Sequence, residues 1–244
     1  MDWTEQAIVL AARKHGEGSA IVELLTPHLG RHAGLVRGAS RPAMRGILQP
    51  GNSVQASWKA RLAEHLGTLT MEMTEARAAL IMTRPEALLA LSSLCALAVA
   101  VLPEREPHRD VYEATGHVLD LLSHEEMTPI DIGQTLVRWE IGLLGSLGFG
   151  LDLSACAVTG EVDNLIYVSP RSGRAVSKEG AGEYAARLLV LPPFLMDGDP
   201  QEVTTEQVQD GFRLSGHFIE LMLLQPHQQS LPPARERYLQ HLAD

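Results

Sequence analysis

The sequence is poor in cysteine and in long apolar runs, and each shortage excludes a class of protein. Its two cysteines, Cys95 and Cys156, are too few for a disulfide framework or a four-cysteine zinc site, so both are expected to be ordinary thiols. The longest apolar stretch, from Ala87 to Leu102, is interrupted by serines and ends before Pro103. It is typical of a buried helix rather than a membrane span. The first residues resemble neither a secretory signal nor a transit peptide, so we expect a cytoplasmic protein with no membrane partner.

Catalytic signatures are also missing. The chain has no GxxxxGK[ST], no HExxH, no GxSxG, and no GxGxxG between a strand and a helix. Its 10 histidines are scattered singly, and each is expected to be a surface or half-buried side chain rather than a base or a metal ligand. We therefore expect no catalytic residue, no cofactor and no enzymatic activity.

Acidic residues are absent from one long stretch, although the formal net charge of the chain is -10. Residues 1–75 hold 8 Lys and Arg and 7 Asp and Glu, which leaves 12 and 23 of the chain's 20 and 30 for the remainder. No acid occurs between Glu23 and Glu64. The basic residues in this stretch are Arg31, Arg37, Arg41, Arg45, Lys59 and Arg61. A local positive field of this kind favours phosphate binding.

The first 75 residues predict short strands. Runs rich in Val, Ile, Leu and Thr are separated by turn residues: QAIVLAAR, SAIVELLT, RHAGLVR, SVQASWKAR and HLGTLTMEM. The segment GASRPAMRGILQPGN lies between the third and fourth runs, where an OB barrel has a connection long enough for a short helix. We therefore predict an α+β fold class, with a five-stranded OB-fold barrel over residues 1–76.

A helical periodicity follows Glu75 and predicts an all-α domain over residues 77–244. Helices are expected over residues 85–102, 108–124 and 128–148, and again over about 179–190, 204–224 and 232–242. Residues 151–178 contain too many turn formers for a helix. They predict an irregular or β-ribbon insert without zinc.

The spacing of the arginines favours a shared phosphate-binding surface. Arg41 and Arg45 lie one helical turn apart, and Arg37 ends a strand just before them. A solvated basic loop is the alternative interpretation, but no neighbouring acid neutralises the run. On the WKAR strand, Lys59 and Arg61 are expected on one face and Trp58 on the other. Trp58 is expected to pack in the core, because a barrel strand buries one side. Stacking of Trp58 on a DNA base is the less favoured alternative.

The order of these motifs resembles a known family. The pattern IVLxxRxxGEGSxIVELLTxxxGRxxGLVRGASR, followed by LQPGN, and the later run VRWEIGLLGSLGFGLDLSACAVTG resemble the barrel and the helical core of the bacterial DNA repair protein RecO family. The resemblance extends over most of the chain. It implies that the barrel binds single- and double-stranded DNA and anneals complementary strands. It also implies that, together with RecR, the protein helps to load the recombinase RecA onto DNA coated with single-strand-binding protein.

The resemblance bears on two sites in the second half of the chain. Many members hold zinc in the insert with paired cysteines, but here Thr159 stands three places after Cys156 and no cysteine follows. We therefore expect no metal and an insert held by packing and backbone hydrogen bonds. The resemblance also implies that an arginine at the place of Arg138 binds the acidic C-terminal tail of single-strand-binding protein beside an apolar groove. An ion pair with Glu140 or another neighbour is an equally good interpretation of Arg138.

A protein-interaction adaptor is the alternative to a DNA-binding recombination mediator. In an adaptor the barrel and the acidic helices contact only proteins, and the arginines serve acidic partners. A mediator is expected to bind heparin and oligonucleotides despite its acidic composition, whereas an adaptor binds neither.

Overall fold

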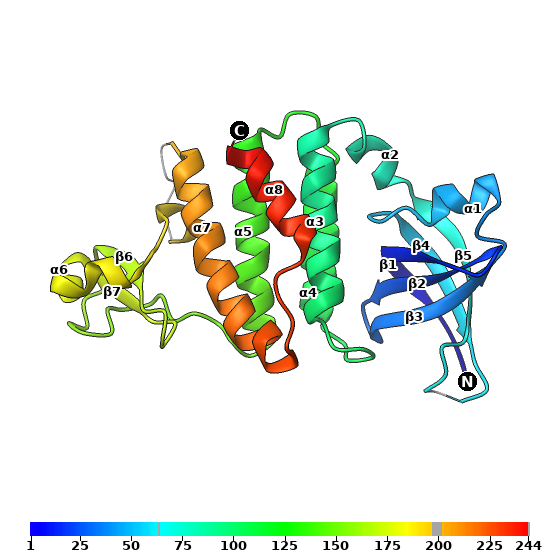
Figure 1. Cartoon of the computed structure of the whole chain (residues 1–244), viewed down its shortest axis with the longest axis horizontal. Helices are drawn as coiled ribbons and strands as arrows, with labels where there is room; N and C mark the ends of the chain where they lie inside the picture. The colour runs from blue at the N-terminus through cyan, green and yellow to red at the C-terminus, as the bar shows by residue number, and fades with distance from the viewer. Residues whose placement is uncertain (63, 197–201, 244) are drawn as a thin grey trace. The chain divides into compact units, whose positions relative to one another are not determined.

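The computed structural model describes residues 1–62, 64–196 and 202–243, and it divides into two compact units (Figure 1). The first unit contains Met1–Met127 and Pro232–Tyr238, and the second contains Thr128–Leu231 and the residues from Leu239 onward. The barrel therefore shares its unit with the first helices. A domain boundary at residues 76–77 stays a prediction.

Five strands close into a barrel, as predicted, in the order β1-β2-β3-β5-β4 (Figure 1). They are β1 (Asp2–His15), β2 (Ser19–Thr26), β3 (Gly30–Arg37), β4 (Ser53–Lys59) and β5 (Thr68–Glu75). The barrel closes through the parallel pair β3–β5 at Leu35 and Thr68. A short helix, α1 (Pro42–Ile47), occupies the connection between β3 and β4. The α+β fold class and the five-stranded barrel of an OB fold are thus confirmed.

Alternating side chains of the strands fill the barrel. Leu24 on β2 is fully buried, and replacing such a side chain by alanine removes about 2–5 kcal/mol of stability. Residues 7–10 of β1 are buried without alternation because helix α3 packs against this strand from outside the barrel. At Gly34 a Cβ would lie 2.5 Å from Cγ of Leu69, so glycine allows β3 to pass close to β5.

Three helices complete most of the first unit: α2 (Arg77–Ile81), α3 (Pro85–Val101) and α4 (Arg109–Leu122). Pro85 occupies the first turn of α3, where its missing N–H leaves no backbone partner unsatisfied. Arg77 connects the barrel to α4, since its guanidinium pairs with Glu75 at 2.5 Å and with Asp120 at 2.7 Å. The short helix α2 was not predicted from the sequence.

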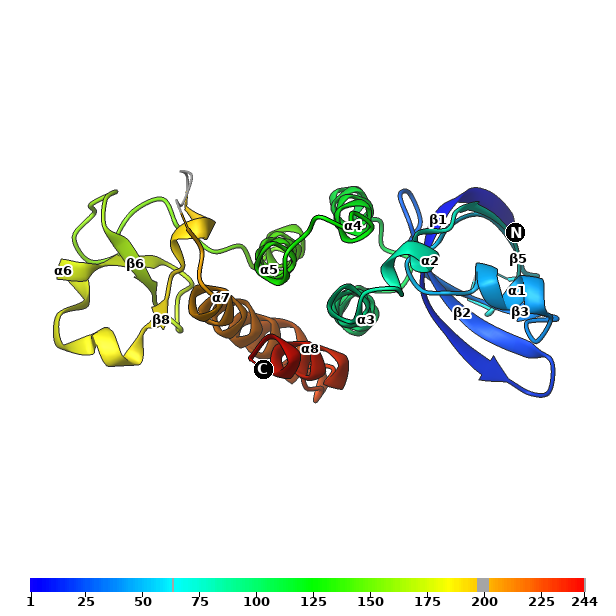
Figure 2. The same cartoon turned by 90° about the horizontal axis from the view of Figure 1, so that it is seen from above.

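In the second unit, helices α5 (Pro129–Ser146) and α7 (Thr205–Phe218) lie side by side (Figure 2). Thr128 and Asp131 form a capping box at the start of α5, and Thr204 and Gln207 form another at the start of α7. A π-helical turn (Ile219–Leu224) and a 3-10 turn (Gln225–His227) follow α7. The last helix described, α8 (Pro233–Ala243), begins in the first unit and ends in the second. None of the helices described is long and apolar enough to cross a membrane.

The insert after α5 contains a small sheet, as the β-ribbon prediction allowed. Its strands are β6 (Leu165–Val168), β7 (Ala175–Ser177) and β8 (Leu189–Val190), in the order β7-β6-β8. The predicted helix over residues 179–190 is wrong. The segment forms α6 (Lys178–Ala181), a 3-10 helix (Gly182–Arg187) and then β8, and a further 3-10 turn spans Pro193–Leu195. Gly180 and Gly182 weaken a continuous helix here, and Gly182 has a positive φ of 47°.

Candidate nucleic-acid interface

Arg37, Arg41 and Arg45 lie at one end of the barrel, and all three are exposed. Arg37 is the last residue of β3, Arg41 is the N-cap residue of α1, and Arg45 lies one turn later. The backbone N–H of Arg45 donates to the carbonyl of Arg41 at 3.0 Å, which fixes the turn that joins them. The side chain of Arg41 folds back toward Gly38, where Nε would lie 3.3 Å from a Cβ. The structure therefore brings this predicted group together.

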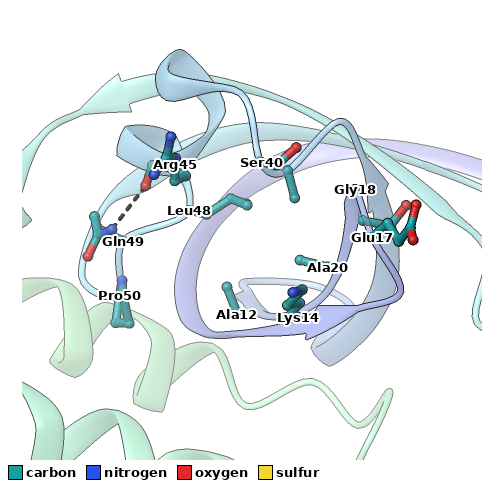
Figure 3. Close-up of a pocket in the computed structure, with 12 residues that line it drawn as sticks. Ala12, Lys14, Glu17, Gly18, Ala20, Ser40, Arg45, Leu48, Gln49 and Pro50 are labelled. Atoms are coloured by element: carbon teal, nitrogen blue, oxygen red, sulfur yellow. Dashed lines mark hydrogen bonds between the residues drawn. The ribbon is translucent and has the colours of Figure 1, made fainter.

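Lys14 joins these arginines and was missed by sequence reasoning. It is an exposed residue near the end of β1, opposite Ala20 of β2. The backbone N–H of Ala39 donates to the carbonyl of Gly18 at 2.9 Å and holds the segment before α1 against the β1–β2 hairpin. Lys14 and Arg45 consequently line one pocket (Figure 3). The strand register places Lys14 with Ala20 and Val36 on the inner side of the sheet and Arg37 with Ser19 on the outer side. We call the cations at this end of the barrel, Lys14, Arg37, Arg41 and Arg45, the basic face. Within the described residues, none of these four side chains forms an ion pair with an acid.

Arg31 differs from the basic face because its side chain is mostly buried and paired with acids. Its side chain is only 13% exposed and pairs with Glu23 at 2.8 Å and with Glu104 at 3.6 Å. Nε also donates to the carbonyl of Leu102 at 2.8 Å. These contacts fasten the barrel to the segment that follows α3. Because its donors are engaged, we leave Arg31 out of the basic face.

Lys59 lies on strand β4 as expected, but Arg61 lies beyond its end, so the predicted alternation of the two residues is only partly observed. The strand ends at Lys59, and Arg61 lies exposed in the bend that follows. Lys59 is opposite Thr68, which in turn pairs with Leu35, two residues before Arg37 on β3. Lys59 is therefore on the outer side of the barrel, with β5 between it and Arg37. On strand β1, Asp2 stands opposite Lys59, and its negative charge weakens the positive field of Lys59.

Trp58 is a core residue, as the more favoured interpretation of the sequence held. Its side chain is 3% exposed, and its indole N–H donates to the carbonyl of Leu66 at 2.8 Å. Trp3 stacks on it with ring centroids 6.1 Å apart, and His32 meets it edge-on at 4.9 Å. Burial lowers the pKa of His32, which keeps the imidazole neutral in this cluster. A base has no access to Trp58.

Arg138 lies on α5 in the second unit and is exposed. It donates to the carbonyl of Phe194 at 2.9 Å, and its guanidinium carbon lies 5.4 Å from the centre of the Phe194 ring. Glu140 is buried and accepts a hydrogen bond from the hydroxyl of Ser215. No ion pair between Arg138 and Glu140 exists in the described part of the chain. The guanidinium therefore stands beside an aromatic ring with donors left for a ligand.

The insert is organised around the thiol of Cys156. Sγ accepts the backbone N–H of Ser177 at 3.2 Å and of Thr159 at 3.4 Å, and the Ser177 hydroxyl donates to it at 3.4 Å. A Cβ on Gly180 would lie 2.8 Å from the same sulfur. Cys156 and Thr159 are three residues apart on one turn, and Ser177 and Gly180 are three residues apart on another. Thr159, Ser177 and Gly180 all lie around the sulfur of Cys156. These hydrogen bonds hold the two turns of the insert together.

The two cysteines differ in chemistry, contrary to the expectation of two ordinary thiols. Burial raises the pKa of Cys95 to about 12. Burial also raises the pKa of Cys156, but the donors of Ser177 and Thr159 outweigh it and bring the pKa down to about 6. In the described parts of the chain, no three His, Cys, Asp or Glu side chains come close enough together to hold a metal ion.

Comparisons with known proteins show which family this chain resembles along its length. The family model described as "Recombination protein O N terminal" matches residues 1–77, and "Recombination protein O C terminal" matches residues 82–231. A DNA repair protein RecO from Rhodospirillum rubrum is 50% identical over 243 residues, which cover 99% of this chain and 96% of that protein. The RecO protein of Rhodospirillum centenum is 49% identical over 241 residues, covering 98% and 94%. That of a Bradyrhizobium species is 47% identical over 240 residues, covering 98% and 95%.

Proposed function

Because this chain belongs to the RecO family of DNA repair proteins, we propose that it binds single- and double-stranded DNA through the basic face and anneals complementary strands. We assign DNA binding to residues 1–76 and protein contacts to residues 77–244. The protein acts in the cytoplasm without catalysis and without a cofactor.

The observation that carries the proposal is the clustering at one end of the barrel of four exposed cations that form no ion pair with an acid among the described residues. Guanidinium groups offer planar pairs of donors that fit phosphate oxygens and remain charged at any physiological pH. Contacts of this kind position a backbone without reading its sequence. Two strands held by the same cations repel each other less, which favours their pairing.

We propose that RecR is a partner and that the two proteins help to load RecA onto DNA coated with single-strand-binding protein. Arg138 supports the second part of this proposal. A guanidinium beside the Phe194 ring suits a ligand that has both a carboxylate and an apolar side chain. The acidic C-terminal tail of single-strand-binding protein has that chemistry.

The DNA proposal is tested by titrating a labelled single strand with the whole protein at low and at physiological salt, and then adding its complement. The account expects salt-weakened binding and faster annealing. Arg41→Ala with Arg45→Ala should weaken binding about tenfold for any sequence, because each phosphate contact contributes about 1 kcal/mol or less. Arg109→Ala is the matched control, since Arg109 is exposed but already paired with Glu113.

An absence of binding at low salt would reject the proposal and favour the protein-interaction adaptor. Equal losses in the double variant and in the control would show that total charge matters rather than the basic face.

The tail proposal is tested separately by the affinity for a peptide with the C-terminal sequence of single-strand-binding protein. Arg138→Ala should weaken it about tenfold, because a hydrogen bond to a charged group contributes about 1.5–3 kcal/mol. Arg213→Ala is the control in the same unit, as Arg213 pairs with Asp210. Unchanged affinity in Arg138→Ala would remove Arg138 from the peptide site.

A further inference from the structure

A pocket of about 350 Å³ opens beside the basic face (Figure 3). The end of β1, the β1–β2 hairpin and the segment around α1 surround it. Its volume is at the lower end of the range of about 300–1,000 Å³ for small-ligand pockets. The pocket is therefore too large to be a packing defect and has the size of one small planar ligand.

The register of β1 explains why this space is empty. β1 pairs with β4 only as far as Ile8, and its register with β2 shifts between Val9 and Ala11. Beyond this shift, β1 pairs with β2 along one edge, and its other edge no longer pairs with β4. Ala12 and Lys14 then stand opposite Val22 and Ala20, whose side chains point into the barrel. The inner side of β1 is thus left open beyond the end of β4.

The pocket combines an apolar floor with a polar rim. Small or apolar side chains form the floor: Ala12, Ala20, Ala39, Leu48 and Pro50. The rim carries Lys14, Arg45, Ser40, Gln49 and Glu17. In Figure 3, Arg45 and Glu17 stand on opposite sides of the opening. One side of the rim therefore favours an anion, and the other offers a carboxylate that accepts hydrogen bonds.

This combination matches a nucleotide within a DNA strand. A nucleobase has two apolar faces, and its edge carries donors and acceptors, while the phosphates on either side are anionic. A donor on the base edge, such as an amino group or the ring N–H of thymine, can donate to Glu17, and the phosphates can approach Lys14 and Arg45. The four cations of the basic face supply the charge complementarity for the strand that leads to the pocket.

We propose that this pocket takes one unstacked nucleobase of single-stranded DNA, while the adjacent phosphates pair with Lys14 and Arg45. The inference rests on the proposed DNA binding and deepens it. A base within a duplex is stacked and paired, so only a single strand fills the pocket without unpairing. Duplex DNA then binds the basic face through its phosphates alone.

The test uses the whole protein and three labelled ligands of equal length: an oligothymidylate, an abasic strand and a duplex. The wild-type protein should bind the oligothymidylate about tenfold more tightly than the abasic strand, because removing about 55 Å² of apolar base surface from water corresponds to about a factor of ten in affinity. Ala12→Met should remove this preference and leave the other two affinities within about twofold. Ala12 is exposed, so a larger side chain there enters the pocket without displacing the core.

Ala43→Met is the matched control, because Ala43 is exposed on α1 between Arg41 and Arg45 but does not line the pocket. Ser40→Leu fills the pocket from the other side and should repeat the effect if Ala12→Met is unstable. An unchanged preference in both filling variants, or equal wild-type binding of the base-containing and abasic strands, would overturn this inference alone. A failure to bind any of the three ligands would overturn the proposed DNA binding and this inference with it.

Discussion

Two parts of the same acid-free stretch have opposite roles. At the start of β3, Arg31 is enclosed by Glu23, Glu104 and a carbonyl, and it contributes to the fold. At the end of β3 and in α1, Arg37, Arg41 and Arg45 are exposed and form no ion pair in the part of the chain that the structure describes. The residue type is the same in both places, and both lie in the stretch of sequence between Glu23 and Glu64 that contains no acid.

The difference comes from residues on other elements, Glu23 on the neighbouring strand β2 and Glu104 after α3. Glu104 reaches Arg31 only because the segment after α3 returns to the barrel, where Arg105 also donates from its backbone to the carbonyl of Arg31 at 2.8 Å. Within the described residues, no acid forms an ion pair with the basic face, although Glu17 lines the same pocket as Lys14 and Arg45. The partners of an arginine, rather than its neighbours in sequence, therefore determine whether it stabilises the fold or is available to a ligand.

The largest effect is expected from removing Arg31. Arg31→Ala leaves the buried carboxylate of Glu23 with only the longer contact to Arg13 at 3.4 Å, and it should lower the free energy of unfolding by about 3 kcal/mol. Arg37→Ala should change it by less than about 0.5 kcal/mol. Urea unfolding of both variants measures this difference. If the two lose equal stability, the comparison between the two parts of β3 fails.

An acid placed beside the basic face should weaken its attraction for DNA, as Glu23 and Glu104 neutralise Arg31. Ser40 is exposed and lines the pocket with Arg45, so Ser40→Glu places a carboxylate among the cations. DNA affinity at low salt should fall about fivefold, and the loss should shrink as salt rises. Ser40→Gln controls for side-chain size. A glutamine variant that binds as poorly as the glutamate variant would point to shape rather than charge.

A smaller effect is expected where a cation already faces an acid. Lys59 stands opposite Asp2, so Lys59→Ala should weaken DNA binding by no more than about twofold. Asp2→Asn should strengthen binding by a similar factor, because it uncovers the charge of Lys59. Titrations of both variants at low salt measure these changes. A loss as large as that of Arg45→Ala would place Lys59 on the basic face.

Much of the fold was predictable from local patterns. Runs rich in Val, Ile, Leu and Thr between turn residues placed all five barrel strands, and proline or a capping threonine marked the starts of α3, α5 and α7. The predicted helix at residues 179–190 failed because glycines break it and β8 pairs with β6 instead. Pairing with a distant strand is not a local property.

The candidate site was predictable to a lesser extent. Spacing alone grouped Arg41 with Arg45, because both belong to one turn. Lys14 and the pocket depend on the register shift in β1 and on the contact between Ala39 and Gly18, neither of which has a sequence signature. The engagement of Arg31 likewise required knowledge of a contact with Glu104, 73 positions away in the chain.

The smallest expected effect concerns the two thiols, which also differ in the partners around them. The ultraviolet absorbance of thiolate should appear with a midpoint near pH 6 and be absent in Cys156→Ser, whereas Cys95 ionises only near pH 12. The folded pKa of Cys156 is below its ordinary value of 9.0, so ionisation stabilises the fold fully above about pH 9 and this contribution is lost as the pH falls through about 6. A midpoint near pH 9 would mean that the donors of Ser177 and Thr159 do not hold a thiolate.

The most direct test of the central claim is the salt dependence of single-strand binding in wild-type protein and in a variant that combines Arg37→Ala, Arg41→Ala and Arg45→Ala. Each phosphate contact contributes about 0.7 to the slope of log affinity against log salt for a single strand. The account predicts that the slope of the variant is smaller by about 2, with its stability unchanged. An unchanged slope would contradict the account, because the phosphates would then be bound elsewhere on the protein.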